Sequence, residues 1–360
     1  MKLKKVVALS LATVLVSGMA LTGCGAKETA KTDTDKNATT GEKMHVEIIA
    51  KGFQHDFWQA VLQGTEKAAK DFNVTTNFVG PETESDIADQ VEMLNNAINK
   101  KPAAIALASL DTSAAIDAIS NAQAQGVPII GFDSGVPGAP EGAVYANAST
   151  DNYAAGALAA DNMFKAIKDK VASPSSTVRI GVVAQDAVSE SITNRTAGFV
   201  ERMSELIGTD KVSVEGHDKY KKEVSGASIV IEVRIPATVD DNSGKTEALT
   251  LLNKEDLIGI YGSNEFAAKS IINANEGMNK LGADKVIAVG FDSGALQLEA
   301  IRTGVFYGSV TQDPVSIGYK AVELAVKAAK GESVTNVDTG ALWYNADNME
   351  SAEIAPCLYE

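Results

Sequence analysis

Two copies of the pentapeptide GFDSG carry the side chains of this sequence with the clearest chemical use. One copy contains Asp133 and the other contains Asp292. Each follows a short apolar run typical of a buried strand, so each aspartate is expected where a strand ends. A carboxylate there can accept hydrogen bonds from two neighbouring hydroxyls of a polyol. It can also simply cap a following helix, but its repetition in both halves of the chain favours a ligand.

The same two carboxylates could in principle act as the acid and the nucleophile of a glycosidase. Such a pair needs one carboxyl with a raised pKa and a fixed separation, whereas polar donors around these aspartates would lower both pKa values. GFDSG also lacks the serine placement of the G-x-S-x-G nucleophile elbow, and the sequence contains no Walker or dinucleotide glycine pattern. We therefore expect a binding protein and not an enzyme, with no cofactor.

Composition excludes several other classes of site. The formal net charge of −15 argues against nucleic-acid binding, which needs basic patches. The histidines His45, His55 and His217 are scattered without metal-ligand spacing, so no metal site is expected. Cys24 and Cys357 are the two cysteines, and they do not form a disulfide framework if Cys24 is modified.

The first 24 residues have the pattern of an export signal. Lysines precede an apolar stretch over 6–22, which is too short for a lasting membrane anchor. This stretch ends in LTGC and resembles the bacterial lipobox, which predicts a signal peptide over 1–23 and a diacylglycerol on Cys24; the alternative is an ordinary signal peptide that contains a cysteine. Residues 24–43 are then the lipidated cysteine and a polar, disordered tether.

The remaining chain alternates short apolar runs with longer amphipathic ones. In the first half, strands are predicted at 45–50, 74–79, 103–108 and 127–130, with helices at 56–72, 85–99 and 112–125. In the second half, strands are predicted at 178–184, 229–235, 257–261 and 285–290, with helices at 191–206, 244–252, 265–280, 295–303 and 315–330. Residues 208–228 are predicted to be a surface excursion, and the tail beyond 342 a final crossover and covering segment.

This alternation predicts an α/β fold with two doubly wound parallel-sheet lobes. In such sheets ligands bind beyond the carboxyl ends of the strands, so Asp133 and Asp292 would point into a shared cleft. Phe57 and Trp58 follow the first strand and could stack on the C–H face of a sugar, although Phe57 could equally be helix core.

Three further polar residues fall near the same predicted edge. Asn264 follows the strand that ends at 261, Gln312 follows the apolar Val310, and Arg195 lies one turn into a predicted helix. Each also has a solvated or capping alternative.

The order of these motifs resembles the ribose/galactose-type solute-binding proteins of bacterial ABC importers, over roughly residues 46–345. The matching segments are DFW after the first strand, PIIGFD, STDN after Asn147, NRTAGF, YGSNE, VGFD and TQDP. The resemblance implies the type I periplasmic binding protein fold, whose two lobes are joined by three crossings. It places the N-terminal lobe at 44–148 plus 313–341 and the C-terminal lobe at 149–312 plus 342–360.

The resemblance also implies a function and a site. A monosaccharide would lie in the interlobe cleft, and the protein would deliver it to the permease subunits of the transporter. Phe57 and Trp58 would stack on the sugar, and the polar contacts would come from His55, Asp133, Ser134, Arg195, Asn264, Asp292 and Gln312. Ribose-binding members carry arginine where this chain has Ser134. One hydroxyl cannot replace its forked donors, so this departure puts ribose in doubt and leaves the sugar open among pentoses, hexoses, polyols and autoinducer-like furanoses.

Two other roles share this fold. A sugar- or autoinducer-sensing protein that signals to a membrane receptor is the alternative that the sequence leaves open. A transcriptional regulator would need a basic helix-turn-helix module at the N-terminus, where this chain has a signal and lipobox. The expected protein is therefore exported, anchored outside the cytoplasmic membrane through its lipid, and a monomer.

Overall fold

The computed structural model describes residues 43–53 and 55–360. The predicted signal peptide, the lipid on Cys24 and nearly all of the tether lie outside these described residues. The same holds for Gln54, which precedes the first predicted site residue.

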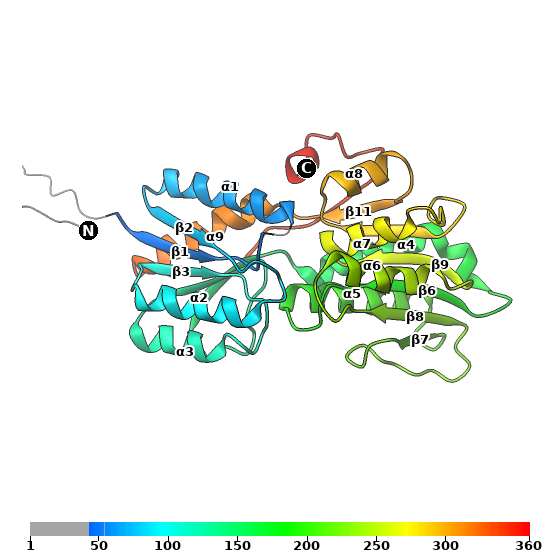
Figure 1. Cartoon of the computed structure of the whole chain (residues 1–360), viewed down its shortest axis with the longest axis horizontal. Coiled ribbons are helices and arrows are strands. Elements are labelled where there is room, and N and C mark those ends of the chain that lie inside the picture. The colour runs from blue at the N-terminus through cyan, green and yellow to red at the C-terminus, as the bar shows by residue number, and fades with distance from the viewer. Residues whose placement is uncertain (1–42, 54) are drawn as a thin grey trace, which may run out of the picture. The chain divides into compact units, whose positions relative to one another are not determined.

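The first sheet is parallel throughout and has the strand order β12-β5-β4-β3-β1-β2 (Figure 1). Its strands are β1 (His45–Ile49), β2 (Thr75–Val79), β3 (Ala104–Leu107), β4 (Ile129–Phe132), β5 (Val144–Ser149) and β12 (Val337–Asp338). Four helices cover it: α1 (Asp56–Asp71), α2 (Ile87–Asn99), α3 (Ile116–Gln125) and α9 (Pro314–Ala329). Parallel neighbours joined through helices are the arrangement that the alternating sequence pattern predicts.

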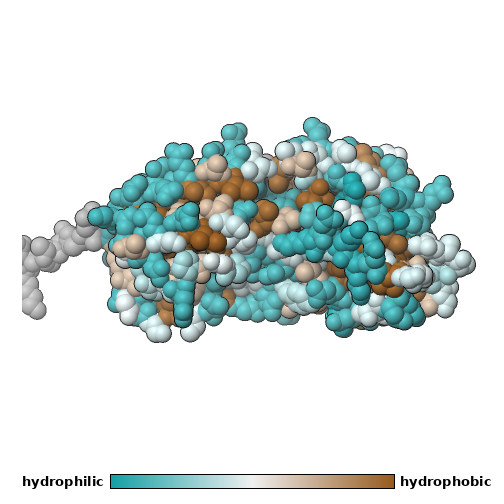
Figure 2. Space-filling model, turned by 90° about the horizontal axis from the view of Figure 1, so that it is seen from below, coloured by the Kyte–Doolittle hydropathy of each residue, from teal (hydrophilic) through white to brown (hydrophobic). Residues whose placement is uncertain are grey.

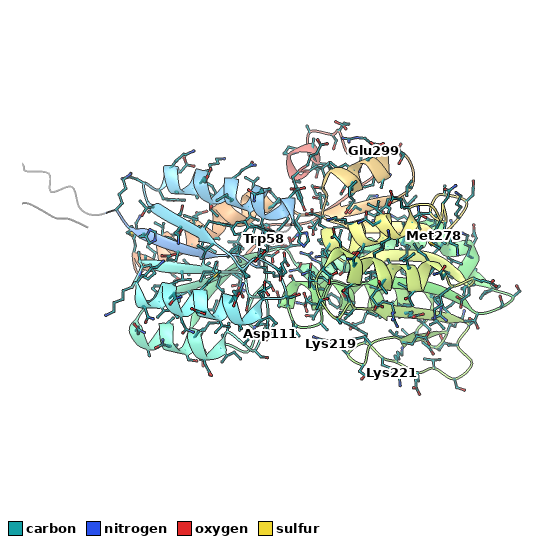
Figure 3. The ribbon with its side chains drawn as sticks, viewed as in Figure 1. Trp58, Asp111, Lys219, Lys221, Met278 and Glu299 are labelled. Atoms are coloured by element: carbon teal, nitrogen blue, oxygen red, sulfur yellow. The ribbon has the colours of Figure 1, made fainter. Side chains whose placement is uncertain are left out.

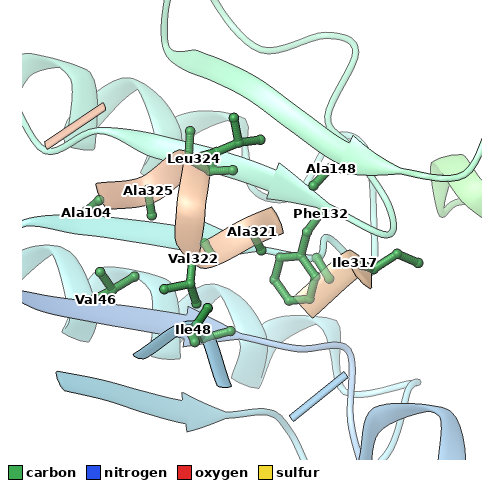
Figure 4. Close-up of a cluster of buried hydrophobic side chains, with 14 of the residues drawn as sticks. Val46, Ile48, Ala104, Phe132, Ala148, Ile317, Ala321, Val322, Leu324 and Ala325 are labelled. Atoms are coloured by element: carbon green, nitrogen blue, oxygen red, sulfur yellow. The ribbon is translucent and has the colours of Figure 1, made fainter. Parts of the chain in front are cut away.

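Successive side chains of each strand enter two different cores. Ile48 and Ala106 pack with α1 and α9, whereas Ile49 and Leu107 pack with α2 and α3, because side chains alternate between the two faces of a strand. Figure 4 shows the first of these cores, in which α9 lies across β1, β3 and β4. Both faces of the sheet are therefore buried, as a doubly wound fold requires.

The second sheet has the order β13-β11-β10-β9-β6-β8-β7. Its strands are β6 (Val178–Val183), β7 (Val212–Glu215), β8 (Ile229–Arg234), β9 (Leu257–Gly262), β10 (Ile287–Phe291), β11 (Gly308–Thr311) and β13 (Leu342–Tyr344), the last antiparallel to β11. The helices α4 (Asn152–Ala172) and α5 (Glu190–Ile207) pack in one core. The helices α6 (Asp241–Leu252), α7 (Glu265–Asn275) and α8 (Ala295–Arg302) pack in the other.

The chain passes between the two sheets three times. It leaves the first sheet after β5 and enters α4, returns after β11 through α9, and leaves again between β12 and β13. At the second passage Asp313 caps α9 by accepting a hydrogen bond from Ser316 N, and Pro314 occupies the first turn, where its missing N–H costs nothing. The predicted α/β fold with two doubly wound lobes and three crossings is confirmed.

Several elements depart from the predicted ones. The strands β5, β7 and β11 and the 21-residue helix α4 are not predicted from the sequence pattern. The segment 208–228 is not only a surface excursion, because β7 within it pairs with β8 and forms an edge of the second sheet. The tail contributes β13 and ends in a short 3₁₀ helix, η1 (Ala355–Cys357).

The surface of the described residues is mostly hydrophilic on the face shown in Figure 2, where apolar side chains lie in separate small groups. Within residues 43–53 and 55–360, no helix combines the length and the apolar character needed to cross a membrane.

Candidate functional site

The aspartates of the two GFDSG turns have the same left-handed backbone conformation. Asp133 follows β4 and Asp292 follows β10, with φ angles of 55° and 68°. Each backbone N–H donates to the neighbouring strand, to Ala148 O at 3.0 Å and to Val310 O at 2.7 Å. A left-handed conformation is uncommon for a residue other than glycine and is concentrated at functional sites. The repeated pentapeptide thus turns the chain sharply at the same point of each sheet.

Neither aspartate caps the helix that follows it. No helix begins between Asp133 and β5, and α8 begins after Gly294 without a side-chain cap. The capping interpretation is therefore wrong for both copies.

Eight of the nine predicted site residues line one cavity between the carboxyl ends of the two sheets. They are His55, Phe57, Trp58, Asp133, Arg195, Asn264, Asp292 and Gln312. Trp58 is labelled in Figure 3, at the edge of the first sheet's helices that faces the second sheet. Elements nearly 260 residues apart in the chain are thus brought to one place, as the strand-end argument predicts.

Ser134 is the predicted residue that does not line this cavity. Its side chain is fully buried, and its hydroxyl accepts a hydrogen bond from Ser191 N at 3.3 Å. The next residue, Gly135, donates its N–H to Glu190 Oε2 at 3.3 Å. Ser134 and Gly135 therefore connect the first GFDSG turn to the beginning of α5, which belongs to the other sheet.

Arg195 lies between the two aspartates. Its guanidinium nitrogens are 4.0 Å from Asp133 Oδ1 and 3.5 Å from Asp292 Oδ2. Its Nε donates to Asn152 Oδ1 at 2.7 Å, and the guanidinium carbon lies 3.9 Å from the centroid of the Phe291 ring. A planar cation held by stacking and by a fixed acceptor keeps its remaining donors directed at the carboxylates.

Asp292 is held by neighbours from its own lobe. Gln312 Nε2 donates to its Oδ1 at 2.7 Å, and Glu265 N donates to its Oδ2 at 3.3 Å. Burial raises the pKa of Asp292 above its usual value, an effect that Arg195 and Gln312 only partly offset. The expectation that polar donors lower the pKa is therefore wrong for Asp292. Gln312 thus orients this carboxylate.

Lys51 is the cation beside the first aspartate, and the sequence analysis does not identify it. Its ammonium lies 3.3 Å from Asp133 Oδ2 and donates to Ser191 Oγ at 2.9 Å. Burial lowers the pKa of Lys51, but the charges of Asp133 and Glu84 outweigh burial and leave this pKa raised. A buried charged lysine therefore supplies a cation beside Asp133.

A chain of hydrogen bonds through Glu84 and Gln185 also connects the two lobes at the cavity. Trp58 Nε1 and Gln185 Nε2 each donate to the Glu84 carboxylate at 2.8 Å. Asn264 Nδ2 donates to Gln185 Oε1 at 2.7 Å, while its own Oδ1 accepts from Ala267 N and so caps α7. The capping alternative therefore applies to Asn264, which also reaches the cavity.

The aromatic side chains that line the cavity all come from residues 55–58. Phe57 and Trp58 are buried and meet edge to face at 5.0 Å, and His55 Nε2 lies 3.7 Å from Glu84 Oε1. From the other lobe, α5 contributes Ile192 beside Arg195. The cavity thus offers an aromatic wall on one side and an aliphatic and cationic wall on the other.

In this conformation the cavity is small, with a volume of about 30 Å³. Small-molecule pockets typically enclose ~300–1,000 Å³, so the side chains described above pair with one another across a closed cleft. A sugar-sized ligand requires the two lobes to separate before it enters.

Several lining residues escape the sequence analysis: Lys51, Glu84, Ser191, Ile192 and Glu265. Lys51 follows β1 by two positions, and Glu265 follows Asn264 at the start of α7. Lys51 and Glu265 could have been found with the rule that selects Asp133, because they also follow the carboxyl ends of strands. Within the described residues, no group of three or more His, Cys, Asp or Glu side chains is placed to hold a metal ion.

Comparisons with known proteins match the whole folded chain. A structure named ABC transporter, LacI family transcriptional regulator from Brachyspira murdochii is 40% identical, covers 88% of this chain and 99% of its own, and superposes with a TM-score of 0.74. An ABC transporter solute binding protein from Agrobacterium vitis with bound D-fucose is 28% identical, covers 88% and 100% of the two chains, and has a TM-score of 0.75.

A curated relative adds sequence support. The D-allose-binding periplasmic protein of Escherichia coli (strain K12) is 24% identical over 296 residues, which are 81% of this chain and 86% of the relative. The family model named periplasmic binding protein domain matches residues 46–333. This match contains every residue that lines the cavity, and the chain therefore belongs to the periplasmic binding protein domain family, whose members bind substrates and do not transform them.

Proposed function

We propose that this protein is the substrate-binding lipoprotein of an ABC transporter, which captures a monosaccharide between its lobes and delivers it to the membrane permease. The observation that carries the proposal is the pairing of Asp133 and Asp292. They occupy equivalent turns of two lobes, line one cavity, and have Arg195 between them. Two carboxylates and a forked cation suit neighbouring hydroxyls, which both donate and accept.

The remaining lining residues complete a sugar site. Phe57 and Trp58 offer apolar faces to the C–H groups of a pyranose or furanose. His55, Asn264 and Gln312 supply amide or imidazole hydrogen bonds, and Ser134 supports the site by fixing the turn of Asp133 against α5. The D-fucose, D-arabinose and D-allose in the names of the relatives make hexoses and pentoses the first candidates.

The two lobes close around the ligand by hinge bending. We assign 44–148 plus 313–341 to the N-terminal lobe and 149–312 plus 342–360 to the C-terminal lobe. Three short crossings connect them, and a few backbone torsions at such crossings can absorb a large closure motion. The direct pairs across the cleft, such as Lys51 with Ser191 and Gln185 with Glu84, then give way to pairs with the sugar.

The predicted signal peptide and lipobox support a location outside the cytoplasmic membrane. We assign a diacylglycerol anchor to Cys24, with the residues up to 43 as the tether that lets the lobes reach the permease. A monomer is sufficient, because each chain contains both halves of the site.

A thermal-shift panel tests the proposed capture. A ligand at 100 times its Kd stabilises by about 2.7 kcal/mol, which corresponds to a rise of about 5 °C in melting temperature for a protein of this size. We expect such a rise with at least one of a panel of pentoses, hexoses, polyols and furanones. The panel is run at low concentration, since concentrated sugars stabilise proteins by exclusion. A panel without any shift would refute the sugar assignment.

A further inference from the structure

The C-terminal tail is attached to the second GFDSG turn. Ser293 Oγ lies 3.0 Å from Tyr359 N and 3.2 Å from Tyr359 O, and Gly294 N donates to the same carbonyl at 3.0 Å. Further back, Thr311 Oγ1 donates to Cys357 O at 3.0 Å. These bonds fix residues 357–359 to the carboxyl ends of β10 and β11.

Adjacent residues of this tail pack against different lobes. Leu358 packs with the core formed by α6, α7 and α8 of the C-terminal lobe. Tyr359 packs with the core formed by α1 and α9 of the N-terminal lobe, and its ring centroid is 6.2 Å from that of Phe57 in a nearly perpendicular arrangement. The tail therefore crosses from one lobe to the other beside the cleft.

The contact on Phe57 matters because Phe57 is part of the cavity wall. Its ring meets Trp58 from its own helix, its N–H donates to Glu265 Oε2 at 3.3 Å, and Tyr359 packs against it. Two of these three partners belong to the C-terminal lobe. Phe57 thus reaches its full set of contacts only when the lobes are together.

The tyrosine ring is suited to a contact that forms and breaks. Burial, with the nearby charges of Asp292 and Glu265, raises the pKa of the Tyr359 phenol well above its usual value, so the ring stays neutral. Its shorter anchoring bonds join the backbone of Tyr359 to the Ser293–Gly294 turn, and its hydroxyl accepts a longer one from Ser293 N at 3.4 Å. All of these groups move with the C-terminal lobe. Closing the lobes therefore brings the ring onto Phe57 without reorganising the tail.

We propose that Tyr359 is a positioning residue that straps the C-terminal tail across the cleft and holds Phe57 in the ligand-binding wall. This role rests on the proposed sugar-binding function. It also explains why the two GFDSG turns contact the opposite lobe in different ways. The serine and glycine of the first turn bind the opposite lobe directly at α5, whereas those of the second bind it through the tail.

The test compares Tyr359→Ala with Tyr359→Phe, which keeps the ring. Tyr145→Ala is the matched control, because Tyr145 is 48% exposed and lies on β5 away from the tail. Two quantities are measured in the purified full chain: hydrogen exchange of the amides of residues 56–61, and the dissociation constants for D-fucose and D-allose.

We expect Tyr359→Ala to speed exchange at 56–61 and to weaken sugar binding, each by about tenfold, as the loss of an aromatic pair across the cleft implies. Tyr359→Phe keeps the ring and loses only the long hydrogen bond from Ser293 N to the hydroxyl, so both quantities should stay within about threefold of the wild type. Tyr145→Ala should match the wild type in both quantities. Unchanged exchange in Tyr359→Ala would overturn the strap. Faster exchange with unchanged affinity would show that Tyr359 is merely structural.

A second variant keeps the proposal testable if the first variant misfolds. If Tyr359→Ala does not fold, Ser293→Ala removes the hydroxyl that anchors the tail and should speed exchange at 56–61; no change there contradicts the proposal. If the wild type binds neither sugar, the dissociation constants are measured with the sugar that the thermal-shift panel identifies, and the exchange comparison still decides whether Tyr359 holds Phe57.

Discussion

Asp292→Asn and Asp133→Asn should each lower the affinity for the bound sugar by about 100-fold or more. Each substitution removes charge-assisted hydrogen bonds to sugar hydroxyls, which contribute roughly 1.5–3 kcal/mol apiece. It also leaves Arg195 facing one carboxylate instead of two. Titration calorimetry with the sugar identified by the thermal-shift panel measures the loss.

The two variants should differ in the melting temperature of the protein without sugar. Burial already disfavours the charged form of Asp292, so a neutral amide of the same shape should leave the melting temperature unchanged or raise it. Asp133 balances the buried ammonium of Lys51 at 3.3 Å, so Asp133→Asn should lower it, because removing one partner strands a buried charge. Equal melting temperatures with intact binding in both variants would contradict this assignment.

The second large effect is a loss of affinity as the pH rises. Burial, together with the charges of Asp292 and Asp56, raises the pKa of Glu265 to about 8, although the amides of Phe57 and Asp56 act in the opposite direction. These amides begin α1 of the opposite lobe and donate to Glu265 at 3.3 Å. Opening the cleft exposes Glu265, whose pKa then returns toward its ordinary value of 4.5.

The sign of this effect follows from proton uptake. The closed form holds a proton on Glu265 that the open form releases, so closure becomes progressively less favourable between pH 4.5 and about 8 and changes no further above that. The raised pKa of Asp292 acts in the same direction, as closure also buries this group.

We expect sugar affinity to fall by about tenfold between pH 6 and pH 8.5. This is less than the fall that the full difference in the pKa of Glu265 between the closed and open forms would give. Glu265→Gln keeps an acceptor for the α1 amides but cannot ionise, and it should flatten most of this dependence. Affinity measured by titration calorimetry across this pH range checks the expectation. A pH profile that is identical in the wild type and in Glu265→Gln would exclude Glu265 as the titrating group.

The sequence predicted the architecture well where the strands were strongly apolar. The runs that became β1, β3, β4 and β10 are buried on both faces, so their composition is distinctive. The strand β5 was missed because VYANAS mixes small and polar residues, and only alternate positions are buried. The edge strand β7 lies in a charged segment, and beyond β8 it pairs only through an isolated bridge between Val214 and Lys222.

The sequence does contain features that indicate the missed helix α4. Asp151 caps it by accepting a hydrogen bond from Ala154 N, and the sequence beyond is rich in alanine, the residue with the highest helix propensity. The sequence of α4 shows only a weak amphipathic pattern, because the helix packs against both α5 and the strands of the second sheet. The periodicity of apolar residues therefore did not reveal this helix.

The site was predicted through one rule, that ligands meet the carboxyl ends of parallel strands. That rule selected Asp133 and Asp292, and pairing them across two lobes correctly favoured the cavity over the cap. It could not show that Ser134 turns toward α5, because that contact depends on how one lobe meets the other. It could not show that Lys51 neutralises Asp133 either, because the strands before them, β1 and β4, are not neighbours in the sheet. The contact of Tyr359 with Phe57, across 302 positions of the chain, has no sequence signal at all.

A crystal structure of the protein with its sugar tests the central claim most directly. The account predicts one sugar ring between the lobes, with hydroxyls within hydrogen-bond distance of both Asp133 and Asp292 and its apolar face on Phe57 or Trp58. A sugar bound at any other place, with the two carboxylates still paired only to Arg195 and Lys51, would contradict it.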